Sequence, residues 1–357
     1  MSDPYIVVSS VQLARPAKVA ASAKALLFHR KESFLRGFRI DQQIIVFGIF
    51  AMLFICFSVF LPGFFSTQNI LTLVRNVSVL GILGLGMAIV VIGRGIDLSM
   101  VAMLAVPAGL VLQMLQRGHG LAYSLAVGLG LAAMMGLFSG LLIAYAEVPA
   151  LFVTLAMGIV LAGIGQSGMF DYEIVEMPAN FTGLDLLGHG NLFGIPFMVL
   201  TLIASVFLVG LFMQRTRLGA FIYAIGDNPL AARTSGISTR PMIVLQYFLT
   251  GLIGAFAGLV MASSVNSMNT HIFNSTLIYD VILVVVLGGI GLSGGRGSVL
   301  NVVIGTLLIG TLINGMTILN MSYSMQDLIK GLILLLAILI DTFTNPRNEE
   351  TAQQGDI

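Results

Sequence analysis

The sequence predicts an all-α integral membrane protein, a bundle of about ten transmembrane helices with its N- and C-termini in the cytoplasm. Composition is the first reason. Of the 357 residues, 57% are hydrophobic and only 9% are charged, whereas a soluble domain carries about 25% charged residues because its surface faces water. A chain of this composition requires lipid over most of its surface, so membrane lipid is its first expected partner.

Long apolar runs are the second reason, because a bilayer core of roughly 30 Å requires about 20 apolar residues per helix. The runs are Ile44–Leu61, Val77–Gly93, Leu98–Leu115, Leu121–Ala144, Val148–Met169, Ile195–Met213, Met242–Ala262, Leu277–Leu292, Val299–Leu319 and Leu328–Ile340. Only Arg94–Asp97 separates the second run from the third, so one of these two can be a broken or re-entrant element. The eighth and tenth runs are short, and each can be tilted or partly re-entrant.

The distribution of Lys and Arg predicts the orientation, since cytoplasmic loops carry an excess of these residues. The first 43 residues and the loop of residues 214–241 are rich in Lys and Arg, and Arg94, Arg296 and Arg347 fall on the same side if ten spans alternate. The opposite side holds Arg117 and an acidic loop. Both termini and the 214–241 loop are therefore expected in the cytoplasm.

Three parts follow from this pattern. Residues 1–43 form a basic cytoplasmic leader, which can be an interfacial helix on anionic lipid or a disordered determinant of orientation. Residues 44–342 form the transmembrane domain, and residues 343–357 form a polar cytoplasmic tail.

Several functional classes are disfavoured. Cys56 is the only cysteine, and the four histidines are scattered, so we expect no disulfide framework, no metal site and no catalytic residues. No GxxxxGK[ST] motif occurs, so a chain that uses ATP must rely on another subunit. The run from Gly289 to Gly294 matches GxGxxG, but apolar spans flank it, which predicts a glycine-rich turn rather than a nucleotide site. The sequence has no polyanion-binding block beyond its basic N-terminus, so no nucleic-acid partner is expected.

Residues 93–99 interrupt the apolar sequence with two charges, which are costly inside a bilayer. In one interpretation they lie at the membrane interface, with Asp97 as the N-cap of the third span and Arg94 paired to it. In the other, this broken backbone lines a cavity near a solute path, with Asp97 and Ser99 beside it.

The loop of residues 226–236 reads as a short helix. Asn228 can cap it, Pro229 suits its first position and Gly236 suits a left-handed end. Such a helix outside the membrane can dock a partner or simply connect two spans.

Polar residues also gather at the outer end of the eighth run, where Asp280 follows Asn266 and Asn269. They form either an interfacial cluster or a gate for a polar solute. Thr154 is an uncharged polar residue inside the fifth run. The candidates for a translocation path or gate are therefore Asp97, Ser99, Thr154, Asn266, Asn269 and Asp280.

Three pairs of glycines are spaced four residues apart: Gly136 and Gly140, Gly254 and Gly258, and Gly291 and Gly295. Such a pair places two small residues on one helix face, which lets helices approach closely. The pairs favour a tightly packed bundle.

Four stretches together resemble a known family. They are Gly95–Ser99, Ala224–Ile237, Val148–Leu155, and Val286–Gly289 with Gly294–Gly297. Over roughly residues 45–342 the chain resembles the permeases of bacterial monosaccharide ABC importers, the group of the ribose, xylose, arabinose and galactose systems.

The resemblance implies a permease subunit of the bacterial inner membrane that is not itself an enzyme. It implies an ABC ATPase subunit that binds ATP and Mg, a periplasmic sugar-binding protein, and a second permease copy, identical or paralogous. The residues implied to contact the ATPase are Gly226, Asp227, Asn228, Pro229, Ala232, Arg233 and Gly236.

Two other functions remain open from the residues. An ion-coupled secondary transporter would need a coupling carboxylate, for which Asp97 and Asp280 qualify. A permease for another small polar solute, such as a branched-chain amino acid, would need paired charges along the path.

Overall fold

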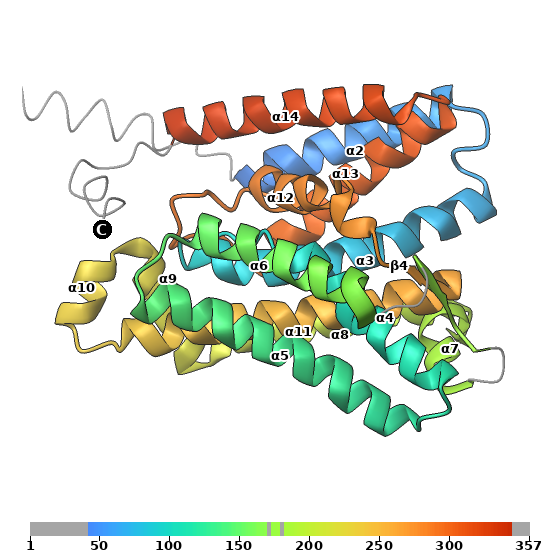
Figure 1. Ribbon diagram of the computed structural model, residues 1–357. Coiled ribbons are helices and arrows are strands. Elements are labelled where there is room, and N and C mark those ends of the chain that lie inside the picture. The colour runs from blue at the N-terminus through green and yellow to red at the C-terminus, as the bar shows by residue number, and fades with distance from the viewer. Residues whose placement is uncertain (1–41, 170–172, 179–181, 345–357) are drawn as a thin grey trace, which may run out of the picture. The chain divides into compact units, whose positions relative to one another are not determined.

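The computed structural model describes residues 42–169, 173–178 and 182–344, and it divides into two units, residues 1–45 and residues 46–357 (Figure 1). In chain order the described elements are α2 (Gln42–Phe60), α3 (Thr67–Ile92), α4 (Met100–Gln116), α5 (Leu121–Tyr145), α6 (Ala150–Ile164), the π-helix η2 (Gly165–Met169), β1 (Ile174–Glu176), α7 (Thr182–His189), β2 (Asn191–Leu192), β3 (Ile195–Pro196), α8 (Phe197–Arg215), α9 (Arg217–Asp227), α10 (Pro229–Thr234), α11 (Thr239–Val265), β4 (Ser267–Asn269), the 3-10 helix η3 (Ile272–Asn274), α12 (Leu277–Leu287), α13 (Val299–Ile318) and α14 (Tyr323–Thr344). The predicted leader and tail fall almost entirely outside the described residues, so their roles stay predictions.

Eight of the described helices are long and apolar enough to cross a membrane, namely α2, α3, α5, α6 with the start of η2, α8, α11, α13 and α14. Two more are apolar but shorter: α4 has 17 residues and α12 has 11. Each predicted apolar run overlaps one of these helices, which confirms a helical protein with many membrane spans. That all ten cross the bilayer stays a prediction.

Two helices are much longer than the apolar runs that predicted them. The run Leu328–Ile340 belongs to α14, which has 22 residues and is therefore not the short element that the run suggested. The polar start of α14, with Asp327, lowers the local hydropathy without ending the helix. In the same way, the polar residues Arg75 and Asn76 interrupt the apolar pattern of α3. The predicted run therefore missed the first part of this helix, which has 26 residues.

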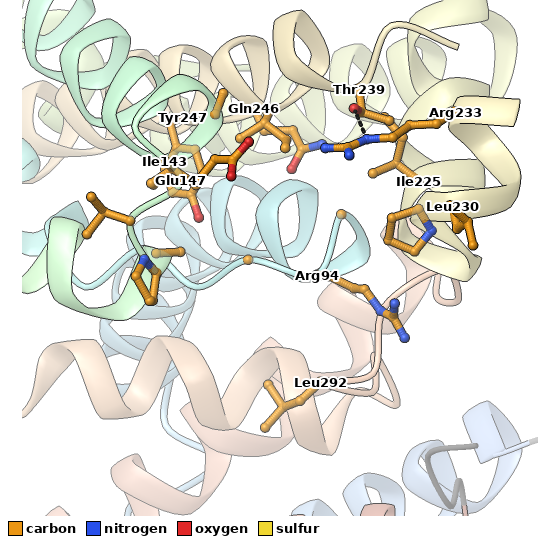
Figure 2. A pocket seen from close by; sticks show the side chains of 18 of the residues that line it. Arg94, Ile143, Glu147, Ile225, Leu230, Arg233, Thr239, Gln246, Tyr247 and Leu292 are labelled. Atoms are coloured by element: carbon orange, nitrogen blue, oxygen red, sulfur yellow. Dashed lines mark hydrogen bonds between the residues drawn. The ribbon is translucent and has the colours of Figure 1, made fainter. Parts of the chain in front are cut away.

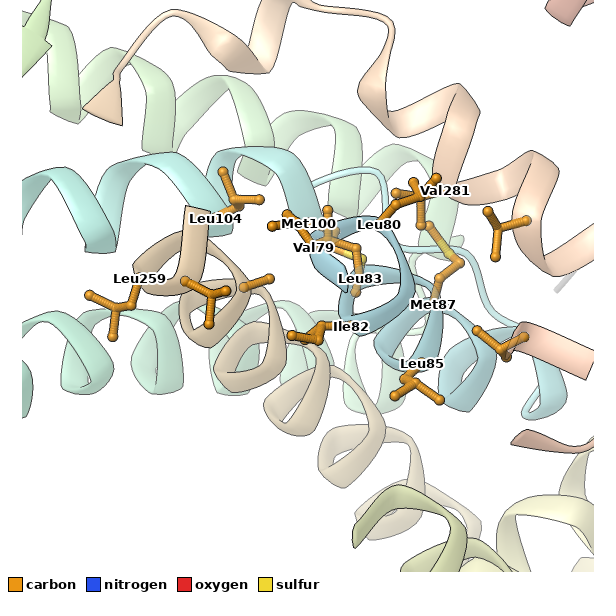
Figure 3. Close-up of a cluster of buried hydrophobic side chains, with 14 of the residues drawn as sticks. Val79, Leu80, Ile82, Leu83, Leu85, Met87, Met100, Leu104, Leu259 and Val281 are labelled. Atoms are coloured by element: carbon orange, nitrogen blue, oxygen red, sulfur yellow. The ribbon is translucent and has the colours of Figure 1, made fainter. Parts of the chain in front are cut away.

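Helix α3 lies at the centre of the hydrophobic core. Every residue from Val77 to Ile92 is buried. Figure 3 shows side chains of this helix, Ile82 and Leu83 among them, close to Leu104 of α4, Leu259 of α11 and Val281 of α12. Because this part of α3 is buried on every side, α3 is the element around which the others pack.

Glycines bring α11 close to both α5 and α4. A Cβ added to Gly140 of α5 would lie 2.7 Å from the Val244 Cα of α11, and one added to Gly254 of α11 would lie 3.3 Å from the Met100 carbonyl oxygen of α4. Two of the predicted glycine pairs are therefore confirmed as close-packing faces.

The third pair, Gly291 and Gly295, is wrong as a helix face. These residues lie in the turn between α12 and α13, and Gly295 has a φ of +71°. A left-handed residue of this kind does not continue a right-handed helix. The glycine-rich turn predicted here is confirmed.

The all-α prediction needs a correction in the loops, because the described residues also contain four short strands. β1 pairs antiparallel with β4, with Val175 opposite Met268, and β2 pairs with β3. The Gln116 amide at the end of α4 donates to the Glu176 carbonyl, with 2.7 Å between nitrogen and oxygen. The loops that alternation places on the outer side thus meet one another.

Candidate functional site

The segment between α8 and α11 folds into two short helices at one end of the bundle (Figure 1). The Asn228 side chain caps α10 by accepting a hydrogen bond from the Ala231 N–H at 3.0 Å, and Pro229 occupies the first position of the helix. Gly236, two residues beyond α10, has a φ of +83°. The predicted short helix, with its cap and its left-handed end, is confirmed.

Helix α9 was missing from the sequence analysis. The Thr216 hydroxyl caps it by accepting a hydrogen bond from the Gly219 N–H at 3.1 Å. Its buried face contains Gly219, Ile222, Ile225 and Gly226, and the three- and four-residue spacing of these residues is the signal that would have revealed it.

The end of α9 packs into a junction with two other segments. The Gly295 N–H donates to the Ile92 carbonyl oxygen at 2.8 Å. A Cβ on Gly226 would collide with that same oxygen and would lie 2.5 Å from the Gly295 nitrogen. A Cβ on Gly295 would in turn lie 2.6 Å from the Asp227 Cα. The end of α9, the end of α3 and the glycine-rich turn are therefore in backbone contact, and none can shift without moving the others.

The predicted pair of Arg94 and Asp97 is wrong. Arg94 has a φ of +71°, and its Nε donates to the Ser293 carbonyl oxygen at 2.8 Å, in the glycine-rich turn. Ser99, rather than Asp97, stands at the N-cap of α4. The left-handed backbone at Arg94 aims its side chain at the turn, which the spacing of the two charges did not reveal.

Asp97 is instead a buried carboxylate held by hydroxyl groups. One of its oxygens accepts from the Ser99 N–H at 3.0 Å and from the Ser99 hydroxyl at 2.5 Å, and the other accepts from the Thr250 hydroxyl of α11 at 2.9 Å. Only 1% of Asp97 is exposed. The charge therefore lies inside the bundle, between the end of α3 and α11.

Thr154 lies next to this cluster. Its hydroxyl donates to the Ala150 carbonyl at 2.8 Å and lies 3.4 Å from the Ile96 carbonyl. One turn further along α6, a Cβ on Gly158 would be 3.4 Å from the Ser99 Cα. The structure thus brings together three of the six candidate path residues: Asp97, Ser99 and Thr154.

The other three candidates hold local structure at the far end of the bundle. Asn266 is the left-handed C-cap of α11, and the Asn269 side chain accepts from the His271 N–H at 2.8 Å. Asp280 of α12 pairs with Lys330 of α14, with 2.9 Å between the carboxylate oxygen and Nζ. Their part in a solute path stays a prediction.

The ion pair is the buried part of a larger cluster that the sequence analysis missed. The Lys330 ammonium also lies 3.1 Å from an Asp327 carboxylate oxygen and 3.2 Å from the Thr276 hydroxyl. Lys330 is 7% exposed and Asp280 is 8% exposed. A charged residue inside an otherwise apolar span is the signal that could have found Lys330.

A cavity of about 500 Å³ opens beside the junction (Figure 2). It is lined by the segment Gly93–Gly95, by residues of the α5–α6 connection such as Glu147, by Leu230 and Arg233 of α10, by Gln246 and Tyr247 of α11, and by Leu292 and Ser293 of the glycine-rich turn. All these segments belong to the end predicted to face the cytoplasm. The cavity therefore connects α10 with the break after α3.

Charged groups around the cavity already have partners. Glu147 accepts a hydrogen bond from Arg240 at 2.7 Å, and Arg240 also stands over the Tyr145 ring, 5.5 Å from its centre. The Arg233 Nε donates to the Thr239 hydroxyl at 3.1 Å. Beside the cavity, Glu147 and Arg240 thus neutralise each other, whereas Arg233 bonds to an uncharged hydroxyl.

Among the residues implied to contact an ATPase, Gly226 and Ala232 are buried and fix the loop to the bundle, whereas Asp227, Asn228, Arg233 and Gly236 are exposed. Leu230, at the tip of α10, is an apolar residue that is 56% exposed. The loop therefore presents a rigid, mixed polar and apolar surface away from the membrane helices.

Comparison with known proteins gives a consistent set of relatives. Residues 69–338 match the family described as "Branched-chain amino acid transport system / permease component". A ribose import permease protein of Bacillus subtilis (strain 168) is 35% identical over 294 residues, which is 82% of this chain and 90% of the relative. The ribose import permease protein of Escherichia coli (strain K12) is 33% identical over 285 residues, 78% of this chain and 87% of the relative. The L-arabinose transport system permease protein of the same strain is 32% identical over 320 residues, 88% of this chain and 94% of the relative. No solved structure matches significantly.

Proposed function

The chain belongs to the permease family described for branched-chain amino acid transport systems, and on that premise we propose that it is the translocating subunit of an ABC importer for a monosaccharide. The observation that carries the proposal is the similarity, over about four fifths of the chain, to permeases named for ribose. A separate ATPase subunit, which binds ATP and Mg, drives alternating access. A periplasmic binding protein delivers the sugar to two permease copies.

The cavity supports a neutral solute over an amino acid. A zwitterion requires an unpaired cation and an unpaired anion at its two ends, because burying an unmatched charge is costly. The Glu147 carboxylate, which lines the cavity, is already bonded to Arg240. A polyol, which offers hydroxyl groups only, fits these surroundings.

Helix α10 is the element that we propose to dock on the ATPase. Its exposed Leu230 and Arg233 provide an apolar contact and a charge for a partner. Its base is joined through Gly226 to the end of α3, which leads to the buried Asp97. A displacement of α10 by the ATPase would therefore reach the membrane segments through backbone contacts.

The proposed orientation in the bacterial inner membrane, with α10 in the cytoplasm, predicts which side each loop can be labelled from. With Cys56 replaced by serine, a cysteine at Phe193, which is 96% exposed, should react with an impermeant reagent in cells whose outer membrane has been opened. A cysteine at Leu230 should react only after the inner membrane is opened too. Labelling with the reverse pattern would contradict the orientation.

ATP hydrolysis by purified protein tests whether the ATPase activity belongs to a separate subunit. The isolated chain should hydrolyse no ATP, because its sequence contains no GxxxxGK[ST] motif. The complex with its ATPase subunit should hydrolyse ATP, and the sugar-loaded binding protein should accelerate it. Hydrolysis by the isolated chain at the rate of the complex would refute the proposal.

A further inference from the structure

Gln246 of α11 has a buried amide whose nitrogen is unpaired among the described residues. It is 1% exposed, and its side-chain nitrogen has no hydrogen-bond partner among the residues that the structure describes. Leaving a buried N–H group unpaired costs free energy that an apolar side chain of similar size would avoid. A buried polar group of this kind calls for an explanation, such as a bound water, ion or ligand.

The position of Gln246 supplies an explanation for this unpaired group. Its side chain lines the 500 Å³ cavity, beside Tyr247 and across from Leu292 (Figure 2). The amide packs against Gly93, where an added Cβ would lie 2.6 Å from the amide nitrogen. The unpaired group thus stands where the broken backbone after α3 forms the cavity wall.

Tyr247, the next residue of α11, also lines the cavity, and its hydroxyl leads to the buried carboxylate. This hydroxyl is 3.5 Å from the Ile96 carbonyl oxygen, one residue before Asp97. Thr250, one helical turn beyond Gln246, donates to Asp97. One face of α11 therefore carries an amide and two hydroxyls in sequence, from the cavity toward the centre of the bundle.

This arrangement has the chemistry of a site for a neutral polyol. An amide offers two donors and an acceptor, and rotation of its last side-chain bond exchanges their positions. A hydroxyl both donates and accepts. Cavities of about 300–1,000 Å³ with a few convergent polar groups are the usual size and form of small-molecule sites. Apolar residues such as Ile143, Ile225 and Ile243 also line the cavity, together with the charged residues Arg94, Glu147 and Arg233.

We propose that this cavity is a sugar-binding site on the cytoplasmic side of the permease, in which the Gln246 amide binds hydroxyl groups of the monosaccharide before its release. The proposal rests on the proposed function, because it assumes that a sugar passes through the chain. Gln246 is then a residue that contacts the solute, whose hydroxyl groups pair with its nitrogen.

Protection of a cysteine in the cavity tests this. In a variant with Cys56 replaced by serine and Ile143 by cysteine, the purified permease without ATPase is labelled with a small thiol reagent. D-ribose, D-fructose, L-arabinose and L-leucine are added in separate samples. The sugar that the reconstituted complex takes up should slow labelling of Ile143→Cys severalfold, while leaving labelling of Phe193→Cys, which lies outside the cavity, unchanged.

Gln246→Leu should abolish this protection, yet melt at the same temperature as the parent or higher, because it removes an unpaired buried amide. Thr311→Val is the matched control. The Thr311 hydroxyl is also buried without a partner, but it lies on α13, away from the cavity, so its loss should leave protection intact.

Two outcomes would overturn the proposal while leaving the proposed function standing: no protection by a sugar that the same complex transports, or full protection that survives Gln246→Leu. Protection by L-leucine alone would overturn it as well and would assign the cavity to an amino acid. Absence of uptake of all three sugars by an active complex would instead count against the proposed sugar function.

Discussion

Gly226→Ala should reduce sugar uptake by roughly tenfold or more, because the new methyl group has no room. Its Cβ would collide with the Ile92 carbonyl oxygen and lie 2.5 Å from the Gly295 nitrogen. Both neighbours are backbone atoms that cannot rotate away. Inserting a methyl group into such a packed contact typically costs about 1–3 kcal/mol, and about 1.4 kcal/mol corresponds to a factor of ten in an equilibrium. The measurement is uptake per ATP hydrolysed in reconstituted vesicles, together with co-purification of the ATPase.

Gly130→Ala is the matched control, since no atom lies within 4 Å of the Cβ that it would add to α5. Alanine also favours a helix over glycine by about 1 kcal/mol, so uptake should stay at the parent level. Gly236→Val provides an intermediate case, because the site is open but φ is +83°. The left-handed conformation costs a branched residue roughly 1–2 kcal/mol, which should weaken coupling and spare yield. Parent-like uptake with Gly226→Ala would show that the junction does not transmit motion.

Lys330→Met should destabilise the protein by about 3–5 kcal/mol, the usual cost of leaving one partner of a buried ion pair alone. Lys330 is the cation between two carboxylates, Asp280 at 2.9 Å and Asp327 at 3.1 Å. Without it Asp280 is a buried anion on α12. Helix α14, which is otherwise mostly exposed, loses a polar anchor to that helix. The melting temperature of the detergent-solubilised protein measures the loss.

The double variant Lys330→Met with Asp280→Asn separates the charge from the packing. Removing the stranded charge should recover much of the lost stability, even though the ion pair is gone. Asp327→Asn alone should have a small effect, because the Asp327 side chain is 41% exposed and solvent screens its interaction with Lys330. Equal stability of Lys330→Met and the parent protein would mean that the cluster does not hold α14.

The features predicted well from the sequence are those that neighbouring residues determine. The apolar runs located the membrane helices, because burial in lipid imposes a length and a composition on each one. The α10 helix was predicted from Asn228, Pro229 and Gly236, whose roles depend on local backbone geometry. The family was identified from short motifs, and the comparisons confirm it.

The contacts that were missed join residues far apart in the chain. Arg94 looked like a partner for Asp97, three residues away, but it bonds to Ser293, which lies 199 residues further along. Lys330 and Asp280 are 50 residues apart, and hydropathy alone does not pair them. The unpaired nitrogen of Gln246 could not be predicted either, because the residues that surround it come from several distant segments.

The energy source for uptake is the most direct test of the central claim that this chain translocates a sugar for a separate ATPase. Vesicles containing the chain and its ATPase subunit are given D-ribose on loaded binding protein, with ATP on the side of the ATPase. Uptake should require ATP hydrolysis and persist when ionophores collapse all ion gradients. Uptake that continues without ATP and stops when an ion gradient collapses would contradict the account and identify an ion-coupled transporter instead.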